Sequence, residues 1–185
     1  MQASNIPNAI SLGRILLVPP MVVVLLNEYY GAALVLFAVA GVSDALDGYL
    51  AKRYGWGSRL GSILDPLADK LLLVSAYLVL GWLGEIPLWL VMVVVGRDLV
   101  IVAGGVAYHY LIGSYELEPS LLSKLNTLAQ IVLILAMLVT HSVLILPAGL
   151  VAALVYLVLV TTLLSGLSYV WTWGVRALRA KRRPQ

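Results

Sequence analysis

Long apolar runs separated by short polar breaks occupy almost the whole chain. The breaks are rich in glycine, proline or polar residues and lie at residues 27–31, 54–60, 84–87, 113–119 and 141–147. A helix crosses a hydrocarbon core with about 20 consecutive apolar residues, so each run is long enough to span a membrane. The pattern predicts an all-α polytopic membrane protein of six transmembrane helices, over residues 8–26, 31–53, 61–83, 87–112, 119–140 and 147–178.

Composition agrees with lipid as the main solvent of this chain. Of its 185 residues, 62% are apolar and 11% are charged, whereas a soluble domain carries roughly 25% charged residues. We therefore expect one membrane-embedded domain over residues 1–185. The first run lacks a small-residue cleavage site, and we interpret it as a retained helix rather than a signal peptide. The sequence has no cysteine, which excludes disulfides and thiolate metal ligands.

Lysine and arginine collect at alternate ends of the predicted helices. Lys52, Arg53 and Arg59 lie at the second break and five basic residues follow Val175, while the first, third and fifth breaks contain none. Because basic residues are retained on the cytoplasmic side, we expect both termini and the second and fourth breaks to be cytoplasmic. The basic tail suits anionic lipid headgroups, and we expect no nucleic-acid binding because the sequence has no polar domain for it.

Four aspartates interrupt the apolar runs, where a charged side chain costs roughly 2.5 to 3.5 kcal/mol. Asp44 and Asp47 lie late in the second predicted helix, and Asp65 and Asp69 lie early in the third. Spacings of three and four residues put both members of each pair on one helical face. Because the two helices run in opposite directions, both pairs lie at the same depth near the cytoplasmic surface and can converge.

A bound cation would relieve the repulsion among these carboxylates. Carboxylate oxygens without histidine or cysteine favour Mg²⁺ or Mn²⁺, with Ca²⁺ possible. Four aspartates could hold two ions, as two-metal phosphoryl-transfer sites do. Gly48 and Gly61 would let a bulky ligand approach the backbone, and Lys52 with Arg53 would supply cations for its phosphates.

Two other interpretations of the same acids stay open. In the first, they pair with Lys52, Arg53 and Lys70 to support topology and helix packing. In the second, they form the ion path of a divalent-cation transporter, because intramembrane carboxylates serve that purpose. Transporters usually have repeated halves and interrupted helices, whereas all four acids here belong to one helical hairpin near one surface. That placement favours a phosphoryl-transfer site.

The two aspartate pairs are part of a longer pattern. It reads Asp44-Ala-Leu-Asp47-Gly48-Tyr-Leu-Ala51-Lys52, eight residues, Gly61, three residues, Asp65, three residues and Asp69. This pattern resembles the signature of the CDP-alcohol phosphotransferase family. Lys52 stands where the family usually has arginine. A lysine keeps the charge but loses the bidentate fork, and Arg53 could share the role.

The resemblance implies an activity and a role for each residue. Enzymes of this family displace CMP from a CDP-linked lipid by the hydroxyl of an acceptor alcohol, with metal on the pyrophosphate. By resemblance, Asp44, Asp47 and Asp65 would be metal ligands, and Asp69 would bind the second metal and act as general base. The residues implied to line the CDP-lipid are Asn8, Arg14, Asp44, Gly48, Ala51, Lys52 and Gly61. The resemblance also implies a homodimer, which we expect in a bacterial inner membrane with its active site at the cytoplasmic face.

Other stretches resemble two branches of the family. Residues 5–14 and 64–70 are similar to phosphatidylglycerophosphate synthases and to eukaryotic-type cardiolipin synthases alike. Three later features are more similar to the cardiolipin branch, namely Arg97-Asp98, Ser123-Lys124-Leu-Asn126-Thr127, and Thr161-Thr162 through Ser165 to Ser168-Tyr169. This similarity implies CDP-diacylglycerol as donor and phosphatidylglycerol as acceptor. Glycerol 3-phosphate is the alternative acceptor.

Arg97 lies near the middle of the fourth predicted helix, beside Asp98. An unpaired arginine at that depth is improbable. We expect Arg97 and Lys124 to bind the phosphate of the acceptor, because phosphatidylglycerol brings a phosphodiester into the membrane. The alternative is an Arg97 salt bridge that holds helices together or reaches the aspartate cluster.

Overall fold

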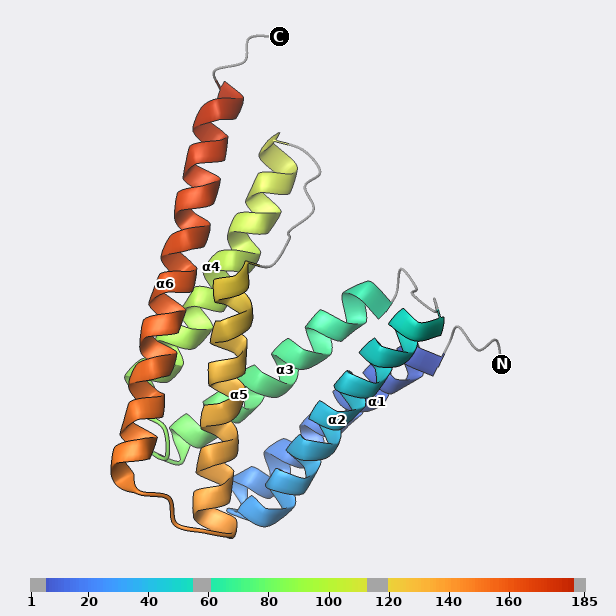
Figure 1. Cartoon of the computed structure of the whole chain (residues 1–185), viewed down its shortest axis with the longest axis vertical. Helices are drawn as coiled ribbons and strands as arrows, with labels where there is room; N and C mark the ends of the chain where they lie inside the picture. The colour runs from blue at the N-terminus through green and yellow to red at the C-terminus, as the bar shows by residue number, and fades with distance from the viewer. Residues whose placement is uncertain (1–5, 55–60, 113–119, 182–185) are drawn as a thin grey trace. The chain divides into compact units, whose positions relative to one another are not determined.

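The computed structural model describes residues 6–54, 61–112 and 120–181, and its side chains are described except at 6–8, 50–52, 62–63, 105–112 and 173–181. These residues form six helices and no strand (Figure 1), as the hydrophobic pattern predicted. In chain order they are α1 (Ile6–Leu26), α2 (Tyr30–Tyr54), α3 (Gly61–Trp82), α4 (Leu88–Ile112), α5 (Leu121–Ser142) and α6 (Ala148–Lys181). Each boundary lies within a few residues of the predicted one, because the glycine and proline breaks stop the helices.

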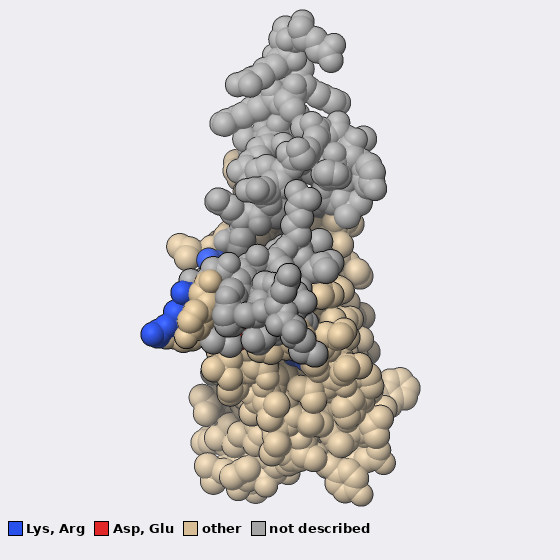
Figure 2. Space-filling view, turned by 90° about the vertical axis from the view of Figure 1, so that its right-hand side faces the viewer, with Lys and Arg blue, Asp and Glu red and all other residues tan. Residues whose placement is uncertain are grey.

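Four of these helices are long and apolar enough to cross a membrane, counting only the described residues. Their apolar stretches are Ala9–Leu26 in α1, Tyr30–Tyr49 in α2, Leu121–Ser142 in α5 and Ala148–Thr172 in α6. Many large apolar side chains point outward along the helices, such as Leu16 and Leu167, each 67% exposed. On the face drawn in Figure 2, the described surface is almost free of charged side chains apart from one basic group at its edge. The fold is that of an integral membrane protein.

The contacts divide the chain into two compact units. The first unit contains Met1–Ile86 and Ile134–Pro147, and therefore holds α1, α2, α3 and the C-terminal half of α5. The second unit contains Pro87–Leu133 and Ala148–Gln185, and holds all of α4 and α6 together with the N-terminal half of α5.

Within the first unit, α1 packs against both α2 and α3. Fully buried alanines, Ala33 and Ala40 on α2 and Ala68 and Ala76 on α3, allow the close helix approach that small side chains give in membranes. Glu85 makes two polar contacts at the end of this unit that lies away from the aspartates. There Glu85 accepts a hydrogen bond from the Tyr30 hydroxyl at 3.0 Å and lies 2.7 Å from Nε2 of His141. Along α2, Tyr30 and Asp44 are about 20 Å apart at the helical rise of 1.5 Å per residue.

The second unit is built on the packing of α4 against α6. Its core combines apolar residues such as Val94 and Val158 with the fully buried polar residues Asn126, Thr162 and Ser165. Buried polar groups in lipid require hydrogen-bond partners within the protein. Asn126 meets this need in part, because its Oδ1 accepts hydrogen bonds from Thr161 at 3.0 Å and from Thr162 at 2.8 Å.

Candidate functional site

Arg14 of α1 lies among the aspartates of α2 and α3. One of its nitrogens, Nη1, contacts Oδ1 of Asp44 at 2.8 Å and Oδ1 of Asp69 at 2.5 Å. The other, Nη2, donates to Oδ2 of Asp47 at 2.5 Å. Three carboxylates from two helices therefore converge on one guanidinium. The helical spacing of each aspartate pair predicted this convergence, but nothing in the spacing pointed to Arg14 at its centre.

The fourth aspartate is held by the same helix. Ser11 lies one turn before Arg14 on α1, and its hydroxyl donates a hydrogen bond to Oδ1 of Asp65. A spacing of three residues puts Ser11 and Arg14 on one face of α1, and both are fully buried. One face of α1 thus holds all four carboxylates, which we call the aspartate cluster (Asp44, Asp47, Asp65 and Asp69).

The aspartate cluster has a buried side and an open side. The side chain of Asp47 is 3% exposed, whereas those of Asp44 and Asp69 are 46% and 40% exposed. Gly48 lies one turn after Asp44, and a Cβ added to Gly48 would meet no atom of the described residues within 4 Å beyond its own stretch of helix. Asp44, Gly48 and Asp69 therefore border open space in which a polar ligand could reach the carboxylates.

The donor set suits a hard divalent cation, because the cluster offers only carboxylate oxygens. Within the described ranges, however, no three acidic or imidazole side chains form a ready-made metal cage. The Arg14 guanidinium lies between the carboxylates instead. The two-ion arrangement stays a prediction, and the residues that would hold the ions are the four aspartates of the cluster.

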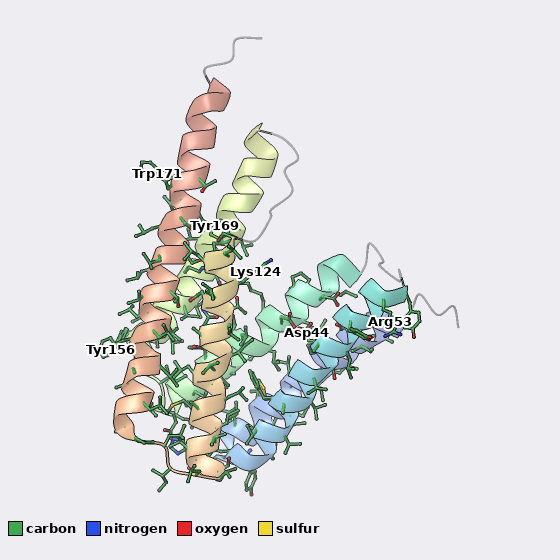
Figure 3. All side chains as sticks on the ribbon, in the orientation of Figure 1. Asp44, Arg53, Lys124, Tyr156, Tyr169 and Trp171 are labelled. Atoms are coloured by element: carbon green, nitrogen blue, oxygen red, sulfur yellow. The ribbon has the colours of Figure 1, made fainter. Side chains whose placement is uncertain are left out.

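Several predicted ligand-binding residues lie outside the cluster. The side chains of Asn8, Ala51 and Lys52 fall outside the described residues. Gly61 is buried at the first position of α3. Arg53 projects from the end of α2 (Figure 3), where it donates to the Tyr49 hydroxyl and lies 5.7 Å from the centre of that ring.

Arg97 forms a second buried polar group, in the second unit. The residue is 8% exposed, and its Nη1 donates to Oδ1 of the adjacent Asp98 at 2.7 Å. Its Nη2 donates to Ser123 of α5 at 2.8 Å and to Ser165 of α6. The guanidinium also lies 5.8 Å from the centre of the Tyr169 ring. Arg97 thus links α4 to α5 and α6 through two serine hydroxyls, whereas its ion pair with Asp98 lies within α4.

Lys124 lies next to this group and borders a groove. The groove has a volume of about 320 Å³ and is lined by Ser123, Lys124, Thr127, Leu128 and Ile131. The Lys124 side chain is exposed and projects from α5 (Figure 3). Ser123 therefore belongs both to the lining of the groove and to the contacts of Arg97.

Sequence reasoning missed the carboxylate partners of Arg14 and the two serine partners of Arg97. It placed Arg14 beside a nucleotide and left three possibilities for Arg97, whereas the structure surrounds Arg14 with carboxylates and Arg97 with one carboxylate and two hydroxyls. One signal was available for Arg14. An arginine within an apolar helix commonly pairs with an opposite charge, and the aspartate cluster was the largest group of acids in the sequence.

The chain is similar to known proteins over most of its length. A family model described as CDP-alcohol phosphatidyltransferase matches residues 4–175. A cardiolipin synthase (CMP-forming) / mitochondrial hydrolase fusion protein of Schizosaccharomyces pombe is 34% identical over 182 residues, which cover 89% of this chain and 30% of the relative. A rat cardiolipin synthase (CMP-forming) is 35% identical over 150 residues, covering 72% of this chain and 50% of the relative.

A relative with another acceptor in its name is also similar. The CDP-diacylglycerol–glycerol-3-phosphate 3-phosphatidyltransferase of Bacillus subtilis is 31% identical over 150 residues, covering 72% of this chain and 76% of the relative. The chain spans half or less of the length of the fission yeast and rat relatives. The family match includes α1 with Ser11 and Arg14 as well as the complete aspartate cluster. The chain belongs to the CDP-alcohol phosphatidyltransferase family.

Proposed function

We propose that this chain is a membrane-embedded CDP-alcohol phosphatidyltransferase, with residues 1–185 acting as one catalytic domain. One observation carries the proposal. The four aspartates of the family pattern gather on one face of α1, and two of them, Asp44 and Asp69, remain open to a ligand. The donor is CDP-diacylglycerol, and the product that leaves is CMP.

The four aspartates have different proposed roles in phosphatidyl transfer. Asp44, Asp47, Asp65 and Asp69 would hold Mg²⁺ or Mn²⁺, which would neutralise charge on the pyrophosphate and stabilise CMP as the leaving group. Asp69, on the open side of the cluster, accepts the proton of the acceptor hydroxyl as that oxygen attacks the phosphorus attached to diacylglycerol. The bond from that phosphorus to the CMP oxygen breaks. Asp47 is buried against Arg14 and orients the site rather than taking up the proton.

The nucleotide is expected to lie along the open space beside Gly48. Ala51 and Lys52 continue α2 by one turn, and Gly61 begins α3, so these residues border the same end of the hairpin. Asn8 lies two turns before Arg14 on α1. We assign these residues to the CDP-lipid, with Lys52 binding its phosphates as a point charge.

For the acceptor we propose phosphatidylglycerol, which would make the enzyme a cardiolipin synthase. The groove beside Lys124 supports this choice, because its lining is mostly apolar, with Leu128 and Ile131, and includes the cationic residue Lys124. A phosphate joined to acyl chains matches both parts of that lining, whereas glycerol 3-phosphate has no acyl chains to match the apolar part. Phosphatidylglycerophosphate synthase is the alternative, supported by the similarity to the Bacillus subtilis enzyme.

We also propose an orientation and an assembly. Both termini and the α2–α3 and α4–α5 connections would lie in the cytoplasm of a bacterial cell, with the aspartate cluster near the cytoplasmic face of the inner membrane. The distribution of lysine and arginine supports this orientation. A homodimer is expected by analogy with the family.

The acceptor is tested by incubating purified protein with CDP-diacylglycerol, Mn²⁺ or Mg²⁺, and either phosphatidylglycerol or glycerol 3-phosphate. Mass spectrometry of the lipid product should find cardiolipin with the first acceptor and no product with the second. Product from glycerol 3-phosphate alone would establish the alternative. Metal binding without CMP release from either acceptor would favour the divalent-cation transporter.

Replacement of Lys124 by glutamine should raise the apparent KM for phosphatidylglycerol about tenfold and leave that for CDP-diacylglycerol nearly unchanged. The reason is that a charge-assisted hydrogen bond is worth roughly 1.5 to 3 kcal/mol. Arg97→Ala should give the same ranking of the two KM values with a larger effect, because Arg97 also orients Ser123. The measurement is initial-rate kinetics with each lipid varied in turn. A larger rise for CDP-diacylglycerol in both variants would refute the assignment.

A further inference from the structure

Arg14 and a divalent ion would draw on the same carboxylates. Arg14 uses one oxygen each of Asp44, Asp47 and Asp69, at 2.8, 2.5 and 2.5 Å. These residues are three of the four that would hold the metal. An arginine side chain remains charged at any pH at which the protein is folded. Its positive charge is therefore a permanent part of the aspartate cluster.

We propose that Arg14 is an internal counter-ion that competes with the divalent ion for the aspartate cluster and so limits how tightly the metal is held. The inference rests on the proposed function, because it takes the cluster to be the metal site. It goes beyond nucleotide binding by Arg14. In this proposal a residue of α1 determines how tightly the carboxylates of α2 and α3 bind the metal.

The contacts support competition rather than simple bracing. Nη1 of Arg14 lies between Asp44 of α2 and Asp69 of α3, the two carboxylates on the open side of the cluster. A cation held by those carboxylates would lie close to the guanidinium, whose side chain is only 1% exposed and is therefore poorly screened by water, so the two positive charges would repel. Removing the charge would therefore strengthen metal binding, even though it removes hydrogen bonds from the ligands.

Ser11 provides the natural contrast on the same face of α1. It holds Asp65 through a neutral hydroxyl, so it positions a carboxylate without competing for it. If α1 only braced the aspartates, loss of either contact would weaken metal binding. If Arg14 is a counter-ion, its loss strengthens metal binding whereas the loss of Ser11 does not, and this difference separates the two roles.

The test is Mn²⁺ binding to the purified protein in lipid nanodiscs, followed by the electron paramagnetic resonance signal of free Mn²⁺. Arg14→Gln should lower the Kd for Mn²⁺ about tenfold. Ser11→Ala should leave the Kd unchanged or raise it. Arg53→Gln is the charge control, because it removes a positive charge that contacts Tyr49, and it should leave the Kd unchanged.

If the Arg14→Gln variant does not accumulate as folded protein, Arg14→Lys provides a second test of the inference. Lysine retains the positive charge but lacks the two guanidinium nitrogens that contact the carboxylates. The Kd of the Arg14→Lys variant for Mn²⁺ should therefore fall by about threefold. An unchanged or higher Kd in the folded Arg14 variants would overturn the inference, as would a wild-type protein that binds no Mn²⁺. CMP release by the wild-type protein is measured in parallel. If Mn²⁺ binds but no CMP is released, the proposed function fails while the Kd values still decide the role of Arg14.

Discussion

Asparagine in place of Asp69 is expected to lower the rate of CMP release from CDP-diacylglycerol by about 10² to 10⁴-fold. The amide is nearly isosteric with the carboxylate but cannot accept the proton of the acceptor hydroxyl, and general-base catalysis contributes a factor of that size. Asp69 lies on the open side of the cluster, where an acceptor hydroxyl could reach it. The measurement is steady-state CMP release by purified protein at saturating lipid and metal.

Asp44→Asn is expected to cause a loss of similar size for a different reason. This variant removes a metal ligand, so it should also weaken Mn²⁺ binding. Glu28→Gln is the matched control, because it changes an exposed carboxylate in the turn between α1 and α2 and should retain activity within about twofold. Normal CMP release by the Asp44 and Asp69 variants, at wild-type levels in the membrane, would mean that the aspartate cluster is not the active site.

Removal of divalent metal by chelation should abolish CMP release and leave the protein folded. Transfer at a pyrophosphate requires a cation to stabilise the leaving group, so activity should return when Mn²⁺ or Mg²⁺ is added in excess of the chelator. The fold should persist because Arg14 continues to neutralise part of the charge of Asp44, Asp47 and Asp69. The measurements are CMP release and the thermal unfolding midpoint, before and after chelation.

The same removal of metal from the Arg14→Gln variant tests the role of Arg14 in keeping the protein folded. Without Arg14, the carboxylates have lost their internal cation, and an uncompensated buried charge is strongly destabilising. The unfolding midpoint of this variant should therefore fall on chelation by more than that of the wild-type protein. Full activity of the wild-type protein in excess chelator would exclude a metal-dependent mechanism.

The partners of Arg97 show which contacts can be predicted from the positions of charged residues in a sequence and which cannot. Its position inside an apolar helix predicted that it must have partners. The adjacent Asp98 was visible in the sequence, but Ser123 and Ser165 are 26 and 68 residues away. No local periodicity connects hydroxyls at such separations. Their contact with Arg97 depends on how α4, α5 and α6 pack within the second unit.

The sequence alone determined the six helices and the location of the acids. Helix length follows from apolar runs and their breaks, and the cost of charge in lipid marked the two aspartate pairs, each on one helical face. The family pattern then indicated phosphatidyl transfer. All of these inferences rest on neighbours along the chain or on spacing within one helix.

Only the tertiary structure placed Arg14 between the two aspartate pairs and Ser11 against Asp65. The axial rotation of α1, and its register against α2 and α3, decide which of its side chains meet the carboxylates. Both depend on how α1 packs against α2 and α3, and therefore on contacts between distant parts of the chain. A buried arginine needs carboxylates, but packing decides which ones it receives.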